Sequence, residues 1–189
     1  MDERMTPNNT VTLETDELIL RSLSIDDTED LFPILSDRSL LRYLFSASET
    51  IEEARKLVKT ISGYDRKWAT WFVARLKKSG AVCGSFMYFS ADIVNKHGSI
   101  AYVLLPEFGR RGLANQAVQA LIRHMFLDLG FNRIEAEVEK ENVRSKAVVA
   151  KLGFTREADC LRQRVFLAGE YRDVEMHSLI REDWDRYGN

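Results

Sequence analysis

An apolar strand, a turn that contains glycines and a long amphipathic helix follow one another without a break in the middle of this chain. Residues 106–122 read PEFGRRGLANQAVQALI, and they follow the apolar run 99–105. Apolar side chains recur every four residues from Leu113 to Leu129, so the pattern predicts a helix that buries one face. Charged and apolar residues then alternate over 133–139, which predicts a strand. A strand, helix and strand in this order indicate a mixed α/β fold.

The rest of the chain predicts further strands and helices on both sides of this unit. A first strand is expected at about Leu13–Leu23, and a short helix over the apolar residues near 31–35. Thr50 and Glu53 have the spacing of a capping box, which predicts a helix over 51–61. The remaining expected elements are a hairpin of strands 68–77 and 81–89, a helix from Asn142 to Gly153, two strands around the turn 168–170, and a terminal helix that reaches Trp184 and Tyr187.

The composition is that of a folded protein with no excess of either charge. The chain has 189 residues, of which 45% are hydrophobic and 30% charged, and 27 basic against 29 acidic residues leave a net charge of −2. These values exclude a disordered chain and argue against a protein that works mainly by binding nucleic acid. Because no repeat or linker interrupts the pattern, we expect one domain over 11–187, preceded by a flexible tail over 1–10.

Three further kinds of protein are disfavoured by the sequence. No apolar run approaches the ~20 residues of a membrane span, and the polar, acidic start lacks the features of a signal peptide. Cys83 and Cys160 lie far apart and the three histidines are scattered. We therefore expect a cytoplasmic protein that has no disulfide, binds no metal and has no membrane partner.

The turn before the long helix has the features of a diphosphate-binding site. Gly109 and Gly112 allow the backbone to approach a ligand closely, and a helix N-terminus presents N–H groups with a partial positive charge. Arg110 and Arg111 add two guanidinium groups that bind phosphate oxygens. The alternative is a solvated pair of arginines. Neither GxxxxGK(S/T) nor GxGxxG occurs, so nucleoside triphosphatases and dinucleotide-dependent oxidoreductases are not supported.

Several segments resemble motifs of one enzyme superfamily, in the order that the superfamily uses. GRRGLA, residues 109–114, resembles the pyrophosphate-binding motif (Q/R)xxGx(G/A) of the GNAT superfamily of acetyl-CoA-dependent N-acetyltransferases. NVRSKAVVAKLGF, residues 142–154, resembles its NxxSxxxxxKLGF helix. The opening, 13–32, and the closing hairpin, 162–179, resemble those of ribosomal-protein N-terminal acetyltransferases of the RimJ/RimL type. The resemblance implies a GNAT fold, in which a central, mostly antiparallel mixed sheet is flanked by helices, in a monomer or a homodimer.

Two residues depart from the pattern of the family. Gly109 stands at the first motif position, where Gln or Arg is usual, and Gln116 stands where many relatives of this type carry Glu. An amide does not accept a proton at neutral pH, so any acid–base role of that Glu is not available to Gln116.

The resemblance also implies a reaction and a set of contacts with the co-substrate. Acetyl passes directly from acetyl-CoA to an amine, and a backbone N–H of the strand before the motif, such as that of Leu104, stabilises the oxyanion. The implied contacts with acetyl-CoA are Val103, Leu104, Leu105, Gly109, Arg110, Arg111, Gly112, Leu113, Ala114, Asn115, Asn142, Ser145 and Lys146.

The 142–154 segment supplies the candidate proton donor. Ser145 stands where RimL-like enzymes place a serine near the cofactor sulfur, and it is expected to protonate the leaving thiolate. The alternative is a secondary cap of the helix. Asn142 is expected to contact the cofactor and to cap the same helix. Arg144 and Lys146 either reach the 3′-phosphate of coenzyme A or lie on a solvated helix face.

The general base is less sharply defined. Glu135, Glu137 and Glu139 share one face of the predicted strand, and one of them is expected to take the proton of the amine through water. A solvated sheet face is the alternative, and Glu107 is a further candidate in a loop. An α-amine, with a pKa near ~8, needs less help than a lysine or polyamine amine near ~10.4, so the lack of an obvious base favours α-amines.

Three functions therefore remain open. The first is acetylation of the N-terminal α-amine of a protein or peptide. The second is acetylation of a small amine, such as a polyamine, an antibiotic-like compound or an aminoacyl conjugate. The third is a module of the same fold that binds acyl-CoA without turnover.

Overall fold

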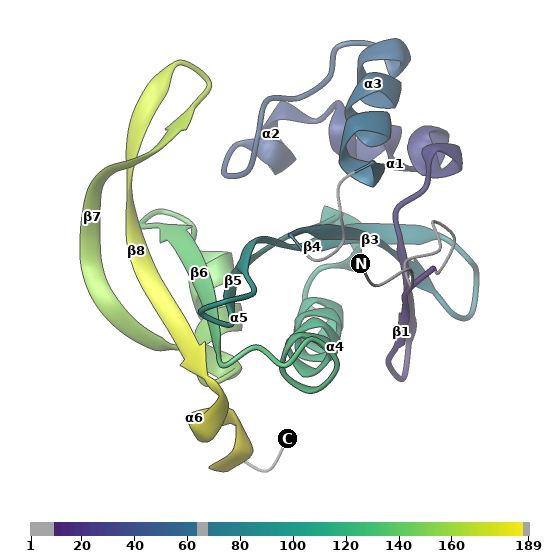
Figure 1. Ribbon diagram of the computed structural model, residues 1–189. Helices are drawn as coiled ribbons and strands as arrows, with labels where there is room; N and C mark the ends of the chain where they lie inside the picture. The colour runs from purple at the N-terminus through teal and green to yellow at the C-terminus, as the bar shows by residue number, and fades with distance from the viewer. Residues whose placement is uncertain (1–9, 64–67, 187–189) are drawn as a thin grey trace, which may run out of the picture.

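The computed structural model describes residues 10–63 and 68–186, which form one eight-stranded sheet covered by helices (Figure 1). The strands are β1 (Thr12–Glu14), β2 (Leu18–Ser22), β3 (Thr70–Leu76), β4 (Val82–Asp92), β5 (His97–Leu104), β6 (Arg133–Glu139), β7 (Thr155–Leu167) and β8 (Glu170–Ile180). Their order in the sheet is β1-β2-β3-β4-β5-β6-β8-β7. Neighbours are antiparallel except for β5 and β6, which run parallel. The predicted fold class, a mostly antiparallel mixed sheet flanked by helices, is confirmed.

Helices cover both faces of this sheet. They are α1 (Thr28–Leu35), α2 (Arg38–Leu41), α3 (Ile51–Ser62), α4 (Leu113–Leu127), α5 (Val143–Lys151) and α6 (Arg181–Arg186). In Figure 1, α1–α3 lie above the sheet and α4 lies below it. Helix α5 packs on the same side as α4, against α4 and β6. Thr50 caps α3 by accepting a hydrogen bond from the N–H of Glu53 at 3.2 Å. Within the described residues, no helix has the length and apolar character of a membrane span.

The N-terminal prediction needs two corrections. The single strand expected at Leu13–Leu23 is a hairpin of β1 and β2, because the turn between them is closed locally. Thr15 donates its N–H to the carbonyl of Leu18 at 3.0 Å, and its hydroxyl accepts the N–H of Leu18 at 2.9 Å. Helix α2 was not predicted, since four residues are too few to show a period. It begins after Asp37, whose carboxylate accepts the N–H groups of Ser39 and Leu40.

Two predictions fall partly outside the described residues. The flexible tail expected over 1–10 falls outside them except for Thr10. The terminal helix was expected to reach Tyr187, which also lies outside, and α6 ends at Arg186.

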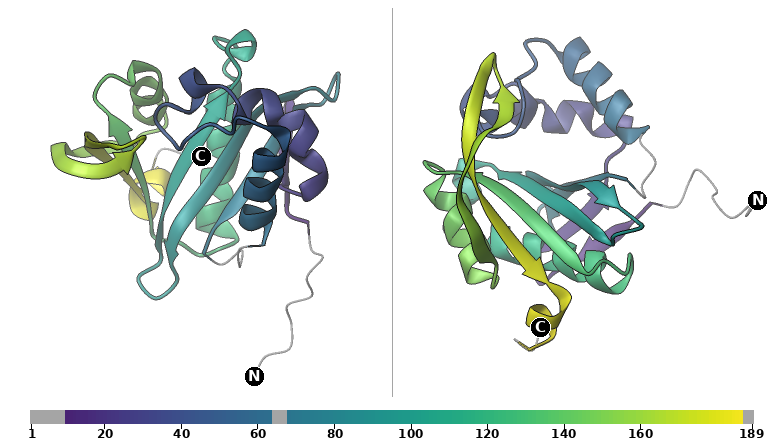
Figure 2. Two further views of the ribbon diagram at one scale, coloured as in Figure 1. Left: turned by 90° about the horizontal axis from the view of Figure 1, so that it is seen from above. Right: turned by 60° about the vertical axis from the view of Figure 1, so that its left-hand side comes forward.

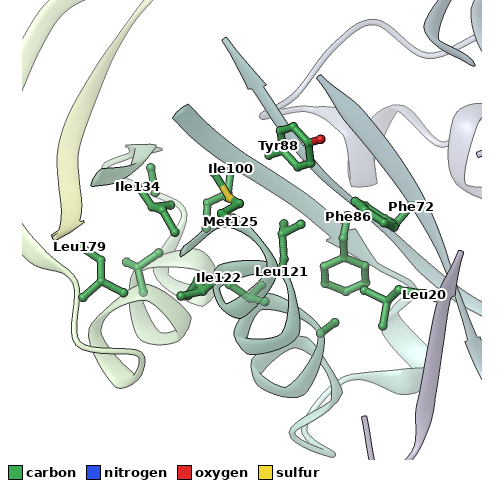
Figure 3. Close-up of a cluster of buried hydrophobic side chains, with 14 of the residues drawn as sticks. Leu20, Phe72, Phe86, Tyr88, Ile100, Leu121, Ile122, Met125, Ile134 and Leu179 are labelled. Carbon is green, nitrogen blue, oxygen red and sulfur yellow. The ribbon is translucent and has the colours of Figure 1, made fainter. Parts of the chain in front are cut away.

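Two apolar cores lie on opposite faces of the sheet. The larger core packs α4 against the middle strands, and Phe72, Phe86 and Tyr88 contribute buried rings to it from the strands (Figure 3). The smaller core lies between the sheet and α1–α3, and Val73 and Val103 contribute to it from the strands. Successive residues of β5 therefore point to different cores, as strand periodicity requires.

The sheet opens between its two parallel strands. β5 and β6 pair only over three residues, from His97↔Arg133 to Ser99↔Glu135, although β5 continues to Leu104 and β6 to Glu139. Beyond that point β6 pairs only with β8. The long hairpin of β7 and β8 then projects beyond the sheet toward α2 (Figure 2), where Arg172 donates to the carbonyl of Arg42 at 3.1 Å.

Candidate active site

The turn before α4 combines a left-handed glycine with an exposed arginine pair. Gly112, the N-cap of α4, has a φ of 78°, and no side chain caps the helix. Arg110 also has a positive φ, 62°. A Cβ on Gly109 would lie 3.0 Å from the carbonyl oxygen of Pro106, a close contact that favours glycine at this motif position. The N–H groups at the start of α4 are thus available to an anion.

Gln116 joins this turn to the β1–β2 hairpin. Its amide NH₂ donates to the carboxylate of Glu17 at 3.1 Å. Its amide oxygen accepts from the Thr15 hydroxyl at 3.0 Å and from the Glu17 N–H at 3.3 Å. A glutamate at 116 could not donate to Glu17 and would repel it, so this contact requires the amide. Gln116 is therefore a structural residue, and its departure from the family pattern has a physical reason.

Arg111 already has one carboxylate beside it. Its guanidinium lies 3.3 Å from Glu17, and both side chains are close to half exposed. An ion pair this exposed is weak, so it leaves Arg111 able to bind a further anion. Arg110 is exposed as well.

The opening between β5 and β6 contains a cavity of about 90 Å³. Leu40, Tyr43 and Leu44 reach it from one face of the sheet, and Asn142 and Ser145 reach it from the other. The strands contribute Ile100, Ala101, Tyr102, Ala136, Glu137, Val138, Glu139, Val165 and Val174. The cavity is thus lined from both faces of the sheet, by Leu40, Tyr43 and Leu44 on one side and by the start of α5 on the other.

Backbone N–H groups of β5 are directed toward this opening. N–H groups alternate between the two edges of a strand, and Leu105 donates its N–H to the carbonyl of Cys83 on β4 at 2.9 Å. The N–H groups of Leu104 and Tyr102 are therefore directed toward β6, which is the direction that an oxyanion donor needs. Of these two residues, only Tyr102 lines the cavity.

Ser145 and Tyr102 meet at the wall of the cavity. Their hydroxyl oxygens are 2.9 Å apart. The carboxamide of Asn142 caps α5 by accepting the N–H of Ser145 at 3.2 Å, so the cap belongs to Asn142 and leaves the hydroxyl of Ser145 free for Tyr102. Burial raises the pKa of Tyr102 to about 12, against a smaller lowering by the Ser145 hydrogen bond. The sequence analysis missed Tyr102. Strand alternation predicts on which face of the sheet its side chain lies, but not that it contacts Ser145.

The three carboxylates of β6 have different surroundings. Glu137 and Glu139 line the cavity, where Arg164 lies 2.8 Å from Glu137 and Arg172 lies 3.2 Å from Glu139. Glu135 lies on the part of β6 that pairs with β5. It does not reach the cavity and bonds to Arg133 at 2.7 Å.

Several other predicted site residues, including the candidate base Glu107, do not line this cavity. Lys146 is 3.2 Å from Glu175, a carboxylate that is only 5% exposed, and is thereby held against β8. Leu113 is fully buried, so only its backbone is available to a ligand. Asn115 lines a second cavity, of about 670 Å³, beside Gly112. Arg144 and Glu107 are exposed.

Comparison with known proteins places these features in a family. The family model described as "Acetyltransferase (GNAT) domain" matches residues 17–155. The N-acetyltransferase p20 of Bacillus licheniformis is 31% identical over 175 residues, covering 92% of this chain and 98% of p20.

Two solved structures show the same fold. The ribosomal L7/L12 alpha-N-protein acetyltransferase RimL, in complex with coenzyme A, is 25% identical, with a TM-score of 0.77 and coverage of 90% of this chain and 98% of RimL. Spermidine N-acetyltransferase from Vibrio cholerae, in complex with coenzyme A and spermine, is 19% identical, with a TM-score of 0.78 and coverage of 90% and 99%. The chain belongs to the GNAT family and is an N-acetyltransferase.

Proposed function

We propose that this N-acetyltransferase transfers acetyl from acetyl-CoA to the α-amine of a protein or peptide, in the manner of RimJ/RimL-type enzymes. The observation that carries the proposal is the cavity between β5 and β6, which is lined from both faces of the sheet and whose walls include Ser145, Tyr102 and Glu137. A direct transfer needs a site that both sides can contribute to, because the thioester and the amine must meet at one point.

The residues on the α4 face fit acetyl-CoA. The left-handed Gly112 and the start of α4 present N–H groups, and Arg110 and Arg111 supply two cations beside them. The side-chain oxygen of Asn115 is buried and has no hydrogen-bond partner among the described residues, which leaves an acceptor for a ligand donor. These residues would hold the co-substrate, whose thioester supplies the activated acetyl group.

Three groups of this chain would then serve the transfer. Glu137 would take the proton of the amine through water, the N–H groups of Tyr102 and Leu104 would stabilise the oxyanion, and Ser145 would give a proton to the leaving sulfur. An α-amine needs little basicity from Glu137, because its own pKa is near ~8.

The charges on the acceptor side favour an acceptor with one amine. Glu137 and Glu139 both have an arginine partner, and these pairs weaken the attraction for a polycation. Beyond them lies an outer cavity of about 640 Å³ whose lining mixes carboxylates with Arg42, Lys140 and Arg172. A peptide carries both charges and hydrogen-bonding groups, so it suits a mixed surface of this kind.

One observation supports a small amine as the second candidate. The carboxylates that line the outer cavity are Glu139, Glu141, Asp159, Glu170 and Asp173, two more than its three basic side chains. This excess would attract a polyamine. We further propose that residues 11–187 act as one domain in the cytoplasm.

A thiol-release assay with matched acceptors tests the proposal. One peptide has a free α-amine and no lysine, its partner has a blocked N-terminus and one internal lysine, and spermidine is the third acceptor. We expect release with the first peptide and a product heavier by one acetyl group at the N-terminus. Release with spermidine alone would select the second candidate. Binding of acetyl-CoA in calorimetry without release on any amine would indicate a binding module.

A further inference from the structure

A tyrosine and a serine from different elements share a hydrogen bond beside the cavity. The phenol oxygen of Tyr102 on β5 lies 2.9 Å from Oγ of Ser145 on α5 and 3.4 Å from the carbonyl oxygen of Ser145. Both residues line the cavity between β5 and β6. The ring of Tyr102 stacks on the ring of Phe86, with centroids 6.0 Å apart and planes inclined by 15°. This stacking restricts the orientation of the phenol.

The chemistry of the two hydroxyl groups decides which one donates. A phenol is more acidic than an alcohol, so the stronger hydrogen bond runs from Tyr102 to Oγ of Ser145. The phenol also stays protonated at neutral pH, because burial raises its pKa to about 12. The proton of Ser145 is then left for another acceptor.

Without the phenol, the hydroxyl of Ser145 would be free to rotate. Ser145 is the third residue of α5, so no earlier turn of the helix offers its hydroxyl a carbonyl partner. The N–H of Ser145 is already satisfied by Asn142, so the phenol is the contact that fixes the hydroxyl itself.

We propose that Tyr102 is a positioning residue that aims the hydroxyl of Ser145 at the leaving sulfur, an inference that rests on the acetyl transfer proposed above. As the C–S bond breaks, its electron pair goes to sulfur, the O–H bond of Ser145 breaks and an S–H bond forms. The hydrogen bond from Tyr102 stabilises the serine oxygen as it gains negative charge. The proton that the amine nitrogen loses on becoming an amide passes to Glu137 through water. Glu137 then returns a proton through water to the oxygen of Ser145, so protons balance and both residues are restored.

Removal of one oxygen atom tests this role. Tyr102→Phe keeps the ring on Phe86 and deletes only the hydroxyl. Tyr88→Phe is the matched control, because Tyr88 is buried on the neighbouring strand and its hydroxyl accepts a hydrogen bond from Thr70 at 2.9 Å. In the thiol-release assay with the α-amine peptide, we expect Tyr102→Phe to lower kcat about tenfold with KM for acetyl-CoA unchanged, and Tyr88→Phe to keep the wild-type kcat.

A double-mutant cycle separates positioning from simple packing. If Tyr102 acts through Ser145, its removal has no further effect on kcat once Ser145→Ala is present. The same cycle is measured on unfolding in urea without acetyl-CoA. There we expect the double variant to lose less free energy of unfolding than the sum of the two single variants, because both substitutions delete the same hydrogen bond.

The outcomes distinguish this inference from the function on which it rests. Full kcat in Tyr102→Phe, or additive effects in both cycles, would overturn the role of Tyr102 while the wild-type enzyme remained active. A wild-type protein that releases no thiol with any amine would refute the proposed function, and the role of Tyr102 would fall with it. Non-additivity in both cycles, with the control unchanged, would support the inference.

Discussion

Strand β6 has different roles at its two ends. At the paired end, residues 133–135, it is hydrogen-bonded to β5, and at the divergent end, residues 137–139, the two strands separate. At the paired end, Arg133 bonds to Glu135 at 2.7 Å and to both carboxylate oxygens of Glu157 at 2.8 and 2.6 Å. At the divergent end, Glu137 lines a cavity that also contains Ser145. Glu135 and Glu137 are two residues apart on one face of β6. The neighbouring strand decides which of the two carboxylates reaches a cavity and which is fixed in a structural network.

The largest expected effect contrasts a serine from each end. Ser145→Ala at the divergent end should lower kcat about a hundredfold, because it removes the proton donor, while the affinity for acetyl-CoA stays unchanged. Ser178→Ala at the paired end deletes a hydroxyl that donates to Glu157 at 2.7 Å and should keep the wild-type kcat. Steady-state kinetics and calorimetry would check this. Equal losses of kcat in the two variants would show that the two ends of β6 do not differ in their role in catalysis.

A pair of carboxamide substitutions tests the same contrast within β6 itself. Glu137→Gln should lower kcat about tenfold, because a carboxamide cannot take the proton of the amine. Glu135→Gln should leave kcat within about twofold, since that carboxylate serves Arg133. The measurement is kcat against pH for both variants. A larger loss in Glu135→Gln would show that the base lies at the paired end.

A third contrast asks whether binding at α4 is independent of chemistry at the divergent end. Arg111→Ala should weaken acetyl-CoA binding about fivefold by removing a charge-assisted contact, with little change in kcat. Glu17→Gln should tighten binding about twofold, because it neutralises the carboxylate 3.3 Å from Arg111. Calorimetric titration measures both. Unchanged affinity in Arg111→Ala would remove this residue from the diphosphate site.

The smallest effect concerns stability at the paired end. Hydrogen bonds from Arg133, and then from Ser178, lower the pKa of Glu157 from 4.5 to about 2. A lowered pKa in the folded state gives stability that is present above about 4.5 and is lost as the pH falls toward about 2. Glu157 is 42% exposed, so solvent screens the pair, and Glu157→Gln should cost about 1 kcal/mol at neutral pH.

Urea unfolding of the wild type and Glu157→Gln at a series of pH values tests that estimate. The two proteins should differ at pH 7 and converge as the pH falls through the window between the two pKa values. A difference that stays constant with pH would show that the carboxylate charge contributes nothing there.

Much of the fold followed from local patterns. The apolar stripe from Leu113 predicted α4, the alternation over 133–139 predicted β6, and Asn142 caps α5 as expected. These signals are strong because each lies in neighbouring residues of one element. The β1–β2 turn and α2 were missed, because the first depends on one hydroxyl of Thr15 and the second is four residues long.

The residue pattern alone indicates the family, the turn before α4 and the set of candidate carboxylates, because each consists of consecutive or regularly spaced residues. Which of these candidates meet depends on the packing of distant elements. Tyr102 and Ser145 are 43 positions apart and come together only through the tertiary structure, in which α5 packs against α4 and β6 beside β5. Lys146, next to Ser145 in sequence, is held by Glu175 of β8 instead. A contact between distant elements depends on where strands pair and where they separate, and no local pattern encodes that geometry.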